Sequence, residues 1–474
     1  MSRKPAFCVH GHFYQPPRED PLTGEIPIEA GAAPYSNWNE KIFHDCYKPN
    51  AEAGNFERIS FNIGPTLFQW LEKYDHPTMA RIIEQENRCF LRYGVGNGMA
   101  QAYNHTILPL MYRRDKVSQI RWGMADFKAR FGHAPAGMWL PETGVDLETL
   151  EVLAENGIQF TILAPWQANQ SGLDVTQPYR VELPGELSIN VFFYEQDLST
   201  RISFDPSATV NADLFSRDYL APKFISTNHH DQLILTASDG ELYGHHQPFR
   251  EKFLNFLLSH SLQVNGIGWT FPGLWLMQNP PEKTIKIREN TSWSCHHGVV
   301  RWSGSCSCTP NSAWKKPFRD GLIKIAEELD DLYEKSMQEW VGGDVWEWRH
   351  GYSQVLLGLL TPEQFVQRLG RGIVSEDLSQ KIQYLLQSQY ERQRMFTSCG
   401  WFFEDFDRIE PRNNVAYAAQ AVWLTFLATG VNIETKAEEW LKPVKSWRSG
   451  LAADAVFRHH LQRARNIQSL QSQD

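Results

Sequence analysis

The sequence lacks the features that mark several large classes of protein. No segment approaches the roughly 18 consecutive apolar residues of a membrane-spanning helix, and no apolar stretch of signal-peptide length follows the basic residues near its start. It has no fixed-period repeat, no low-complexity stretch and no long basic run, and its net charge is -9. We therefore expect a cytoplasmic protein that binds neither a membrane nor, as its main partner, nucleic acid.

Cysteine is also scarce. The chain has 7 cysteines in 474 residues, and an odd number in a long chain fits reduced thiols better than a disulfide framework. Hydrophobic residues make up 42% and charged residues 21%, which supplies a packed core and argues against disorder. At about 150 residues per domain, this length predicts two or three domains, or one large barrel with an appendage.

The order of apolar segments predicts two regions of different class. Up to about residue 275 short apolar runs alternate with amphipathic stretches, and strand, helix, strand in series predicts a parallel sheet. The expected strands are 6–9, 58–62, 137–140, 159–163, 189–194 and 233–237, and the expected helices are 65–74, 77–90, 115–131 and 146–155. Beyond the turn signal at 279–281, helical spacing covers 318–339, 353–369, 378–395 and 415–428.

Polar side chains follow the predicted strands where they end. His10 and His12 come after the first strand, Asn62 closes the next, and Glu142 and Asp239 follow two later ones. In parallel α/β barrels the loops after the strands converge on one face, where active sites lie. Several strand ends carrying Asp, Glu and His therefore indicate one shared site.

Each acid also has a purely structural interpretation. Glu142 follows Trp139, Leu140 and Pro141, and apolar surroundings raise the pKa of a carboxyl group, although an acid here could simply stabilise the start of the helix at 146–155. Asp239 precedes a glycine, and Asp-Gly is a common turn dipeptide. Two carboxyl groups that face one bond can divide glycoside cleavage, one as nucleophile and the other as acid and then base.

Four motifs in order resemble glycoside hydrolase family 57, in a divergent and uncharacterised branch. The first is His12-Phe13-Tyr14-Gln15-Pro16. The second runs from the glycine-rich stretch 94–98 to Tyr103-Asn104-His105, and the third is Trp139-Leu140-Pro141-Glu142. The fourth is Asp239-Gly240-Glu241, followed by Gly244-His245. The resemblance covers about residues 6–300.

The resemblance implies a fold, a reaction and a division of the chain. The fold is α/β, an incomplete (β/α)7 barrel with parallel strands over 1–285, and a mostly α-helical C-terminal domain covers 317–474. The reaction is a retaining double displacement on an α-glucan-type oligo- or polysaccharide, by hydrolysis or transglycosylation, without a cofactor or metal. Glu142 is then the nucleophile and Asp239 the acid/base. The expected substrate-binding residues are His10, His12, Gln15, Asn104, His105, Trp139, Glu241, His245, Trp293 and Trp401.

Two other functions stay open. A metal-dependent carbohydrate hydrolase, of the deacetylase or zinc mannosidase type, would use His10, His12 and Asp239, because histidines at the first strand end can ligate zinc. A glycan-binding protein without catalysis is the other, and the presence of both Glu142 and Asp239 argues against it.

The segment 286–316 is rich in Trp, Cys, Ser and His, and we expect it to be a loop over the barrel mouth with Trp293 at the substrate. Cys295, Cys306 and Cys308 lie close to two histidines in the sequence, and such residues can bind zinc. Cys-x-Cys is not the usual zinc spacing, so buried thiols are the alternative. Two aromatic and acidic patches, 344–349 and 398–405, either pack between helices or present Trp401 or Glu404 to sugar.

Overall fold

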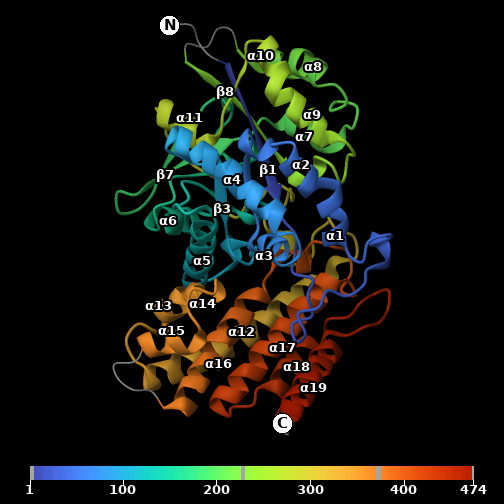
Figure 1. Ribbon diagram of the computed structural model, residues 1–474. Coiled ribbons are helices and arrows are strands. Elements are labelled where there is room, and N and C mark those ends of the chain that lie inside the picture. Colours follow the sequence, from blue (N-terminus) through green and yellow to red (C-terminus); the bar gives the residue numbers. More distant parts are fainter. Residues whose placement is uncertain (1–4, 226–229, 370–374, 472–474) are drawn as a thin grey trace. The chain divides into compact units, whose positions relative to one another are not determined.

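The computed structural model describes residues 5–225, 230–369 and 375–471, and the chain forms two compact units (Figure 1). The first consists of Met1–Gln15, Ile28–Tyr103 and Asp126–Trp293, and the second of Pro16–Pro27, Asn104–Ala125 and Ser294–Asp474. This division differs from the domain boundaries at residues 285 and 316 that the sequence suggests. The loop 286–316 is divided after Trp293, and two early segments pack with the helical part of the chain.

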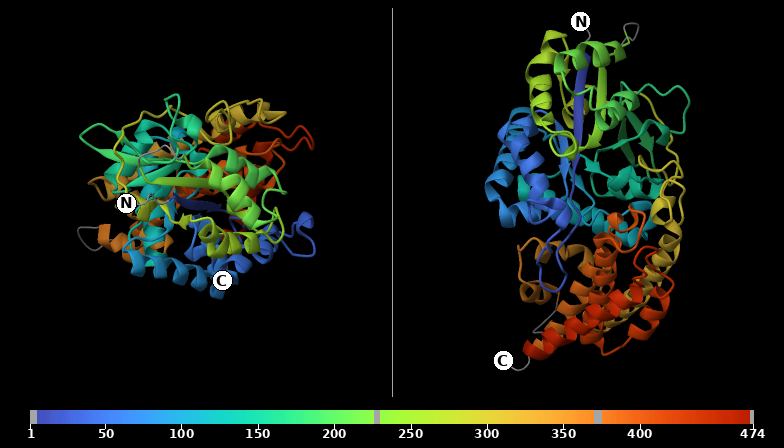
Figure 2. Two further views of the ribbon diagram at one scale, coloured as in Figure 1. Left: turned by 90° about the horizontal axis from the view of Figure 1, so that it is seen from above. Right: turned by 90° about the vertical axis from the view of Figure 1, so that its right-hand side faces the viewer.

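The first unit is built on a parallel sheet. Its strands follow the order β8 (Gln232–Asp239), β1 (Pro5–Phe13), β2 (Ser60–Ile63), β3 (Gly98–Gln101) and β4 (Met138–Trp139), and β9 (Gly268–Trp269) also pairs with β1. Figure 2 shows blue β1 beside green β8. Almost every residue of β1 is buried, as expected for a parallel strand covered on both faces.

Three further strands form a second, smaller sheet. β5 (Phe160–Leu163) pairs in parallel with β7 (Ser188–Phe193), and β6 (Tyr179–Glu182) adds to β7 in antiparallel fashion. One bridge between Gly137 and Phe160 links β4 to β5, and the Glu195 amide after β7 donates to the Leu235 carbonyl of β8 at 2.7 Å. Among the described residues, pairing at the first joint is limited to this bridge and the adjacent bond from the Gln159 amide to the Ala136 carbonyl at 2.8 Å. The predicted fold class, α/β with an incomplete barrel, is confirmed.

Helices surround these strands. In the first unit they are α1 (Trp38–Ile42), α2 (Lys48–Glu52), α3 (Pro65–Tyr74), α4 (His76–Tyr93), α6 (Leu147–Glu155), α7 (Gln196–Phe204), α8 (Ala212–Leu214), α9 (Arg250–Phe256), α10 (Leu262–Val264) and α11 (Pro272–Gln278). Helix α5 (Arg113–Phe131) contributes residues to both units. The side chains of Asp75 and Asp146 cap α4 and α6, which explains why both begin within one residue of the predicted start.

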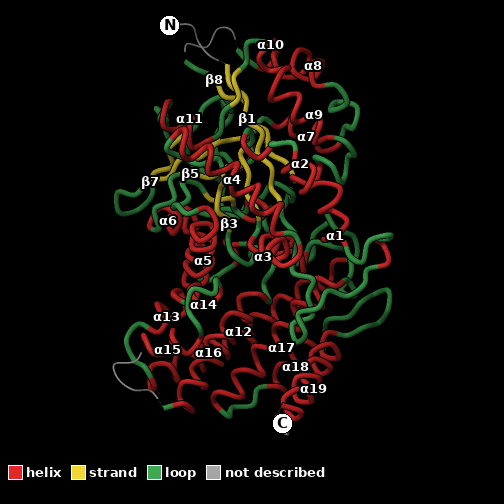
Figure 3. The backbone as a smooth tube through the Cα atoms, viewed as in Figure 1, coloured by secondary structure: helices red, strands yellow, loops and turns green. Residues whose placement is uncertain are grey.

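The second unit is helical, as predicted, and Figure 3 shows its helices in red. It contains α12 (Lys315–Trp340), α13 (Val345–Gly351), α14 (Ser353–Leu356), α15 (Pro362–Leu369), α16 (Glu376–Arg394), α17 (Ile409–Thr429), α18 (Glu434–Leu441) and α19 (Ala453–Gln471). The single helix predicted at 353–369 is wrong, because proline disfavours helix in the residue before it and Pro362 starts a new helix. None of the described helices is long and apolar enough to cross a membrane.

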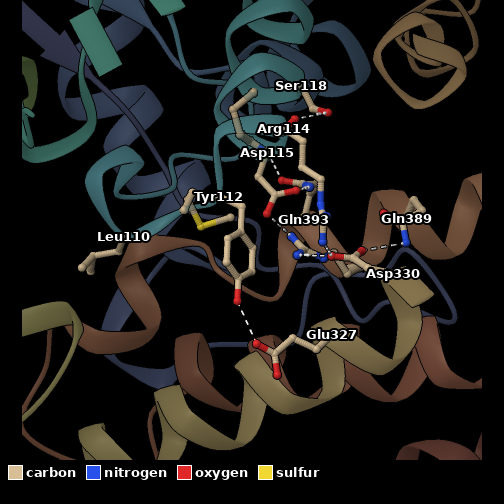
Figure 4. Close-up of polar contacts among 12 residues, drawn as sticks. Leu110, Tyr112, Arg114, Asp115, Ser118, Glu327, Asp330, Gln389 and Gln393 are labelled. Carbon is tan, nitrogen blue, oxygen red and sulfur yellow. Dashed lines mark hydrogen bonds and ion pairs between the residues drawn. The ribbon is translucent and has the colours of Figure 1, made fainter. Parts of the chain in front are cut away.

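A buried ion-pair network joins α5, α13, α12 and α16 within the second unit (Figure 4). Arg392 lies between two carboxylates, 2.8 Å from Asp115 and 2.7 Å from Asp330, and Arg349 is 2.9 Å from Asp115. Gln389 and Gln393 donate further hydrogen bonds to the same two acids. The patch at 344–349 is thereby a packing element, since Asp344 caps α13 and Arg349 is fully buried.

Candidate active site

Strand register places three site residues of the first unit at one level of the sheet. His12 on β1 is paired with Asn62 on β2 and, on its other side, with Asp239 on β8. Asp239 is the last residue of β8, and Gln101 ends β3 beside Trp139 of β4. Polar residues thus lie toward the carboxyl ends of the strands, although β1 continues to Phe13, so that His10 and His12 lie within the strand and not after it as predicted.

The two histidines are held by a polar cluster beneath the site. His10 Nδ1 lies 2.9 Å from Ser60 Oγ, and the Asn62 amide group lies 3.2 Å from His10 Nε2 and 2.9 Å from His12 Nδ1. Burial lowers the pKa of His10 to about 3 and that of His12 to about 4. Both rings are therefore neutral near pH 7 and act as hydrogen-bonding groups without charge.

Glu142 lies in a strained turn after β4. Its φ is 57° and that of Thr143 is 47°, in the left-handed region that residues other than glycine rarely adopt. Gln167 pins this turn, because its Nε2 donates to the Thr143 carbonyl at 2.8 Å and its Oε1 accepts from the Thr143 hydroxyl at 2.9 Å. Strain of this kind costs about 1–3 kcal/mol per residue and clusters at functional sites.

An aromatic wall connects the histidines to this turn. The Trp139 ring stacks on His10 with centroids 4.7 Å apart and on His12 at 5.3 Å, and it meets Trp293 in a T-shaped arrangement at 5.0 Å. Trp293 Nε1 donates to Glu142 Oε2 at 3.0 Å. Trp139 is fully buried, so it supports the site from below, and Trp293 is the ring that touches the acid.

The carboxyl group of Asp239 has a raised pKa. Surrounding protein desolvates its carboxyl group, and the charges of Glu241 and then Glu142 repel a further negative charge, which together raise its pKa to about 8. The side chain is nevertheless accessible to solvent at the strand end. Water moderates the desolvation, but both neighbouring acids act in the same upward direction, so Asp239 holds a proton at neutral pH.

Glu241 is the third acid of the site. Its Oε1 accepts hydrogen bonds from the Tyr47 hydroxyl at 2.7 Å and from the Tyr14 amide at 3.1 Å, and Gln15 Nε2 donates to the Tyr47 oxygen at 3.0 Å. Burial raises the pKa of Glu241 to about 7 against the opposite effect of these hydrogen bonds. Glu241 and Gln15, both predicted from the sequence, therefore form one polar cluster with Tyr47. Tyr47 is a residue that the sequence does not single out.

His245 lies further along the same loop. Its Nδ1 is 2.9 Å from Asp45 Oδ2, and its ring meets Trp38 edge to face at 5.9 Å. Gln101 is a further residue that sequence reasoning missed, although it closes a strand preceded by a glycine-rich run. Its Nε2 and the Trp139 Nε1 are buried donors that have no hydrogen-bond partner among the described residues.

Three expected substrate-binding residues belong to the second unit. Asn104 exchanges hydrogen bonds with Gln119, and His105 Nδ1 lies 2.6 Å from Ser398 Oγ. Trp401 is completely buried in the helical core, stacked on Phe318 at 4.8 Å. Both the burial and the stacking favour the packing interpretation of Trp401 over contact with sugar.

The geometry does not favour the metal-dependent alternative. His10 and His12 both turn nitrogen atoms toward Asn62, and His245 pairs with Asp45. Within the described parts of the chain, one group of side chains converges closely enough to hold an ion, and it consists of Cys295, His297, Cys306 and Cys308. The set His10, His12 and Asp239 is not such a group.

Acids and neutral histidines at the carboxyl ends of parallel strands define an α/β-barrel protein with its site on the C-terminal face. The chain belongs to glycosyl hydrolase family 57, whose sequence profile matches residues 12–288. A second profile, a domain of unknown function (DUF3536), matches residues 311–468. The family membership predicted from the four motifs is confirmed.

Sequence relatives are distant. Alpha-amylase 1 of Dictyoglomus thermophilum is 28% identical over 248 residues, covering 52% of this chain and 32% of that protein. Alpha-amylase of Pyrococcus abyssi is 23% identical over 212 residues, covering 43% and 30%. A 4-alpha-glucanotransferase of Thermococcus litoralis is 25% identical over 174 residues, covering 35% and 25%. The aligned part therefore spans about a third or less of these relatives.

Solved structures share the fold over nearly the whole chain. An exo-type maltose-forming amylase from Pyrococcus sp. ST04 superposes with a TM-score of 0.74 at 14% identity, covering 96% of this chain and 88% of that one. A branching enzyme of family 57 from Pyrococcus horikoshii gives a TM-score of 0.60 at 13% identity, covering 96% of both chains. At these identities the likeness concerns the fold.

Proposed function

We propose that this protein is a retaining enzyme that hydrolyses or transfers α-glucan-type glycosidic bonds, with Glu142 as nucleophile and Asp239 as acid/base. The observation that carries the proposal is the raised pKa of Asp239, to about 8, beside the acids Glu241 and Glu142. A carboxylic acid that is protonated at neutral pH, near a second carboxyl group, is the pair that glycoside cleavage requires.

The chemistry assigns one step to each acid. Asp239 donates its proton to the glycosidic oxygen while the Glu142 carboxylate attacks the anomeric carbon, which breaks the bond to the leaving sugar and forms a glycosyl–enzyme ester. Asp239, now a carboxylate, then takes a proton from water or from a sugar hydroxyl, whose oxygen displaces Glu142. The hydrogen bond from Trp293 Nε1 to Glu142 Oε2 orients the attacking carboxylate.

Two further features support a sugar as the ligand. Gln101 Nε2 and Trp139 Nε1 are buried donors without partners among the described residues, and a buried unsatisfied donor costs about 1–3 kcal/mol unless water or a ligand accepts from it. Neutral His10 and His12 add uncharged hydrogen-bonding groups. A polyhydroxylated, uncharged substrate fits this set better than an anion. The names of the family 57 relatives, amylase and glucanotransferase, suggest an α-glucan.

The test is product analysis with matched variants. The purified chain is incubated with amylose, glycogen and short malto-oligosaccharides, and products are followed by mass spectrometry. We expect shortened or redistributed chains with wild type and with Glu182→Gln, an exposed control on β6, and none with Glu142→Gln. An active Glu142→Gln variant would remove Glu142 from the nucleophile role.

Azide distinguishes the roles of the two acids. With an activated aryl α-glycoside, Asp239→Ala should form its glycosyl–enzyme and pass it to azide, giving a glycosyl azide of retained anomeric configuration. Glu142→Ala should instead give the inverted azide, because azide then replaces the nucleophile directly. The reverse assignment of products would exchange the two roles, and inversion by the wild-type enzyme would refute double displacement.

A further inference from the structure

A cluster of sulfur and nitrogen atoms lies in the loop that opens the last segment of the second unit. Cys295 Sγ is 3.4 Å from Cys306 Sγ and 3.9 Å from Cys308 Sγ. His297 Nδ1 is 3.3 Å from Cys306 Sγ and 3.4 Å from Cys308 Sγ. All four atoms lie within 4.8 Å of one another.

These distances are close to the edges of a small tetrahedron. With metal–sulfur bonds of about 2.3 Å and a metal–nitrogen bond of about 2.0–2.1 Å, tetrahedral angles give edges of about 3.8 Å between sulfurs and about 3.6 Å between sulfur and nitrogen. A disulfide would bring two sulfurs to about 2.05 Å and leave the third cysteine and the histidine unused. Three thiols and one imidazole nitrogen directed to a common centre are the donor set that zinc prefers.

We infer that Cys295, His297, Cys306 and Cys308 form a structural zinc site. The sequence pattern is Cys-x-His, eight residues, and Cys-x-Cys, and the narrow spacing that argues against zinc in the sequence is accommodated by tight turns. Gly298 adopts a φ of 76° directly after His297, and its amide donates to the Cys295 carbonyl at 3.1 Å. Ser312 fastens the second pair, since its hydroxyl accepts from the Cys306 amide at 3.1 Å.

Backbone amides are arranged to stabilise thiolates. The amides of His297 and Arg301 donate to Cys295 Sγ, and the amide of His296 donates to Cys308 Sγ. Such outer hydrogen bonds orient metal ligands and balance their charge. His297 Nε2, the nitrogen that faces away from the sulfurs, lies 3.5 Å from Ser307 Oγ.

A buried cation supplies an independent argument. Lys315, the first residue of α12, is completely buried, and its ammonium group has no hydrogen-bond partner among the described residues. Cys306 and Cys295 are the thiols that interact with it electrostatically. Zn²⁺ with three thiolates and a neutral imidazole carries one net negative charge, which the Lys315 ammonium offsets. With three neutral thiols instead, Lys315 and the repelling Arg301 would have Glu404 as counter-charge, and Glu404 already pairs with Arg448.

The site is structural because four protein ligands fill a tetrahedron and leave no position for water or substrate. Cys295 and Cys306 belong to the hydrophobic core of the second unit together with Trp302 and Trp314. His297 is exposed, which gives an ion a path to the buried thiols. Zinc would therefore fix the loop 295–308 against the helical core.

Metal analysis on the full-length chain, purified without a polyhistidine tag or added metal, tests the assignment. We expect about one zinc per chain in wild type, and less than about a tenth of that in Cys306→Ser and His297→Ala. His296→Ala is the matched control, because His296 is the neighbour of His297 in the sequence but is not one of the four clustered residues. Cys399→Ser controls for the loss of a thiol elsewhere in the chain. Both control variants should keep the full zinc content and the wild-type thermal midpoint. Chelator treatment should lower the thermal midpoint of every form that contains zinc.

Cobalt substitution keeps the test decisive if a ligand variant fails to fold. Wild-type protein stripped under reducing conditions and given one equivalent of Co²⁺ should show thiolate-to-cobalt charge-transfer absorption and the intense d–d bands of tetrahedral cobalt. Three results would each overturn the inference. They are wild type that neither contains nor takes up zinc, iron in place of zinc at full occupancy, and a disulfide among these cysteines in protein alkylated at lysis.

Discussion

Trp293 is bonded to Glu142 twice. The indole nitrogen donates to Glu142 Oε2 and the backbone amide donates to the Glu142 carbonyl, both at 3.0 Å. The two residues are 151 positions apart, so the segment that follows the barrel strands returns to fix the orientation of the proposed nucleophile. Because the indole N–H and the backbone amide both hold Glu142, Trp293 is best described as a positioning residue.

The first prediction removes only the indole N–H. Trp293→Phe keeps a ring against Trp139 but deletes the bond to Glu142, and we expect kcat/KM to fall roughly 10- to 100-fold, because hydrogen bonds to charged groups contribute about 1.5–3 kcal/mol. The thermal midpoint should stay near the wild-type value. Trp447→Phe, at a tryptophan that is 53% exposed in the second unit, is the control. Equal activity of both variants would show that the bond has no role in positioning Glu142.

The second prediction concerns the basic limb of the pH–activity profile. Glu241 is the larger of the two charged contributors to the raised pKa of Asp239. Glu241→Gln removes that charge, and its amide oxygen can still accept from Tyr47 and Tyr14. Asp239 should then lose its proton at a lower pH, so the decline of kcat/KM on the basic side moves to lower pH and activity near pH 8 falls several-fold. A profile that keeps its wild-type basic limb would contradict the coupling between the two acids.

The third prediction follows from the sign of the same shift. The folded pKa of Asp239, about 8, lies above the ordinary value of 3.8, so between these pH values the folded state binds more protons than the unfolded state. Stability therefore falls as pH rises through this window, and above it the site bears the full cost of a repelled carboxylate. Asp239→Asn cannot ionise. The difference between its thermal midpoint and that of wild type should therefore shift in favour of the variant as pH rises from about 5 to about 8.5. An unchanged difference across this range would refute the raised pKa.

The sequence predicted what depends on local pattern and missed what depends on distant packing. The positions of His10, His12 and Asp239 toward the carboxyl ends of β1 and β8 could be predicted because polar residues that end apolar runs mark such strand ends. Helix α3 matches its predicted bounds because Pro65 starts it in the first turn, where proline is tolerated. Tyr47 was missed because it lies in a π-helical turn between α1 and α2, and nothing in its neighbourhood predicts the hydrogen bond to Glu241, 194 residues away.

The convergence of the cysteines was also beyond a spacing argument. Cys-x-Cys is an unusual zinc pattern, and only the turns around Gly298 and Ser312 bring both pairs to one point. The assignment of 16–27 and 104–125 to the helical unit is a similar case. Such segments carry no composition of their own that identifies their packing partners, which are some two hundred or more residues further along the chain.

The last prediction tests the buried network of the second unit. Burial alone would raise the pKa of Asp115, but Arg392 and Arg349 hold it below its ordinary value, so both Asp115 and its partners are charged in the core. Arg392→Met keeps the length of the side chain and leaves Asp115 and Asp330 with part of their counter-charge removed. We expect a loss of about 3–5 kcal/mol in the free energy of unfolding of this unit, measured by denaturant titration.

Lys316→Met breaks an exposed pair with Asp320 on α12 and should change stability by less than about 1 kcal/mol. If both substitutions had the same small effect, the network would contribute no more than a surface ion pair, and the double variant Asp115→Asn/Arg392→Met would show no coupling beyond additivity.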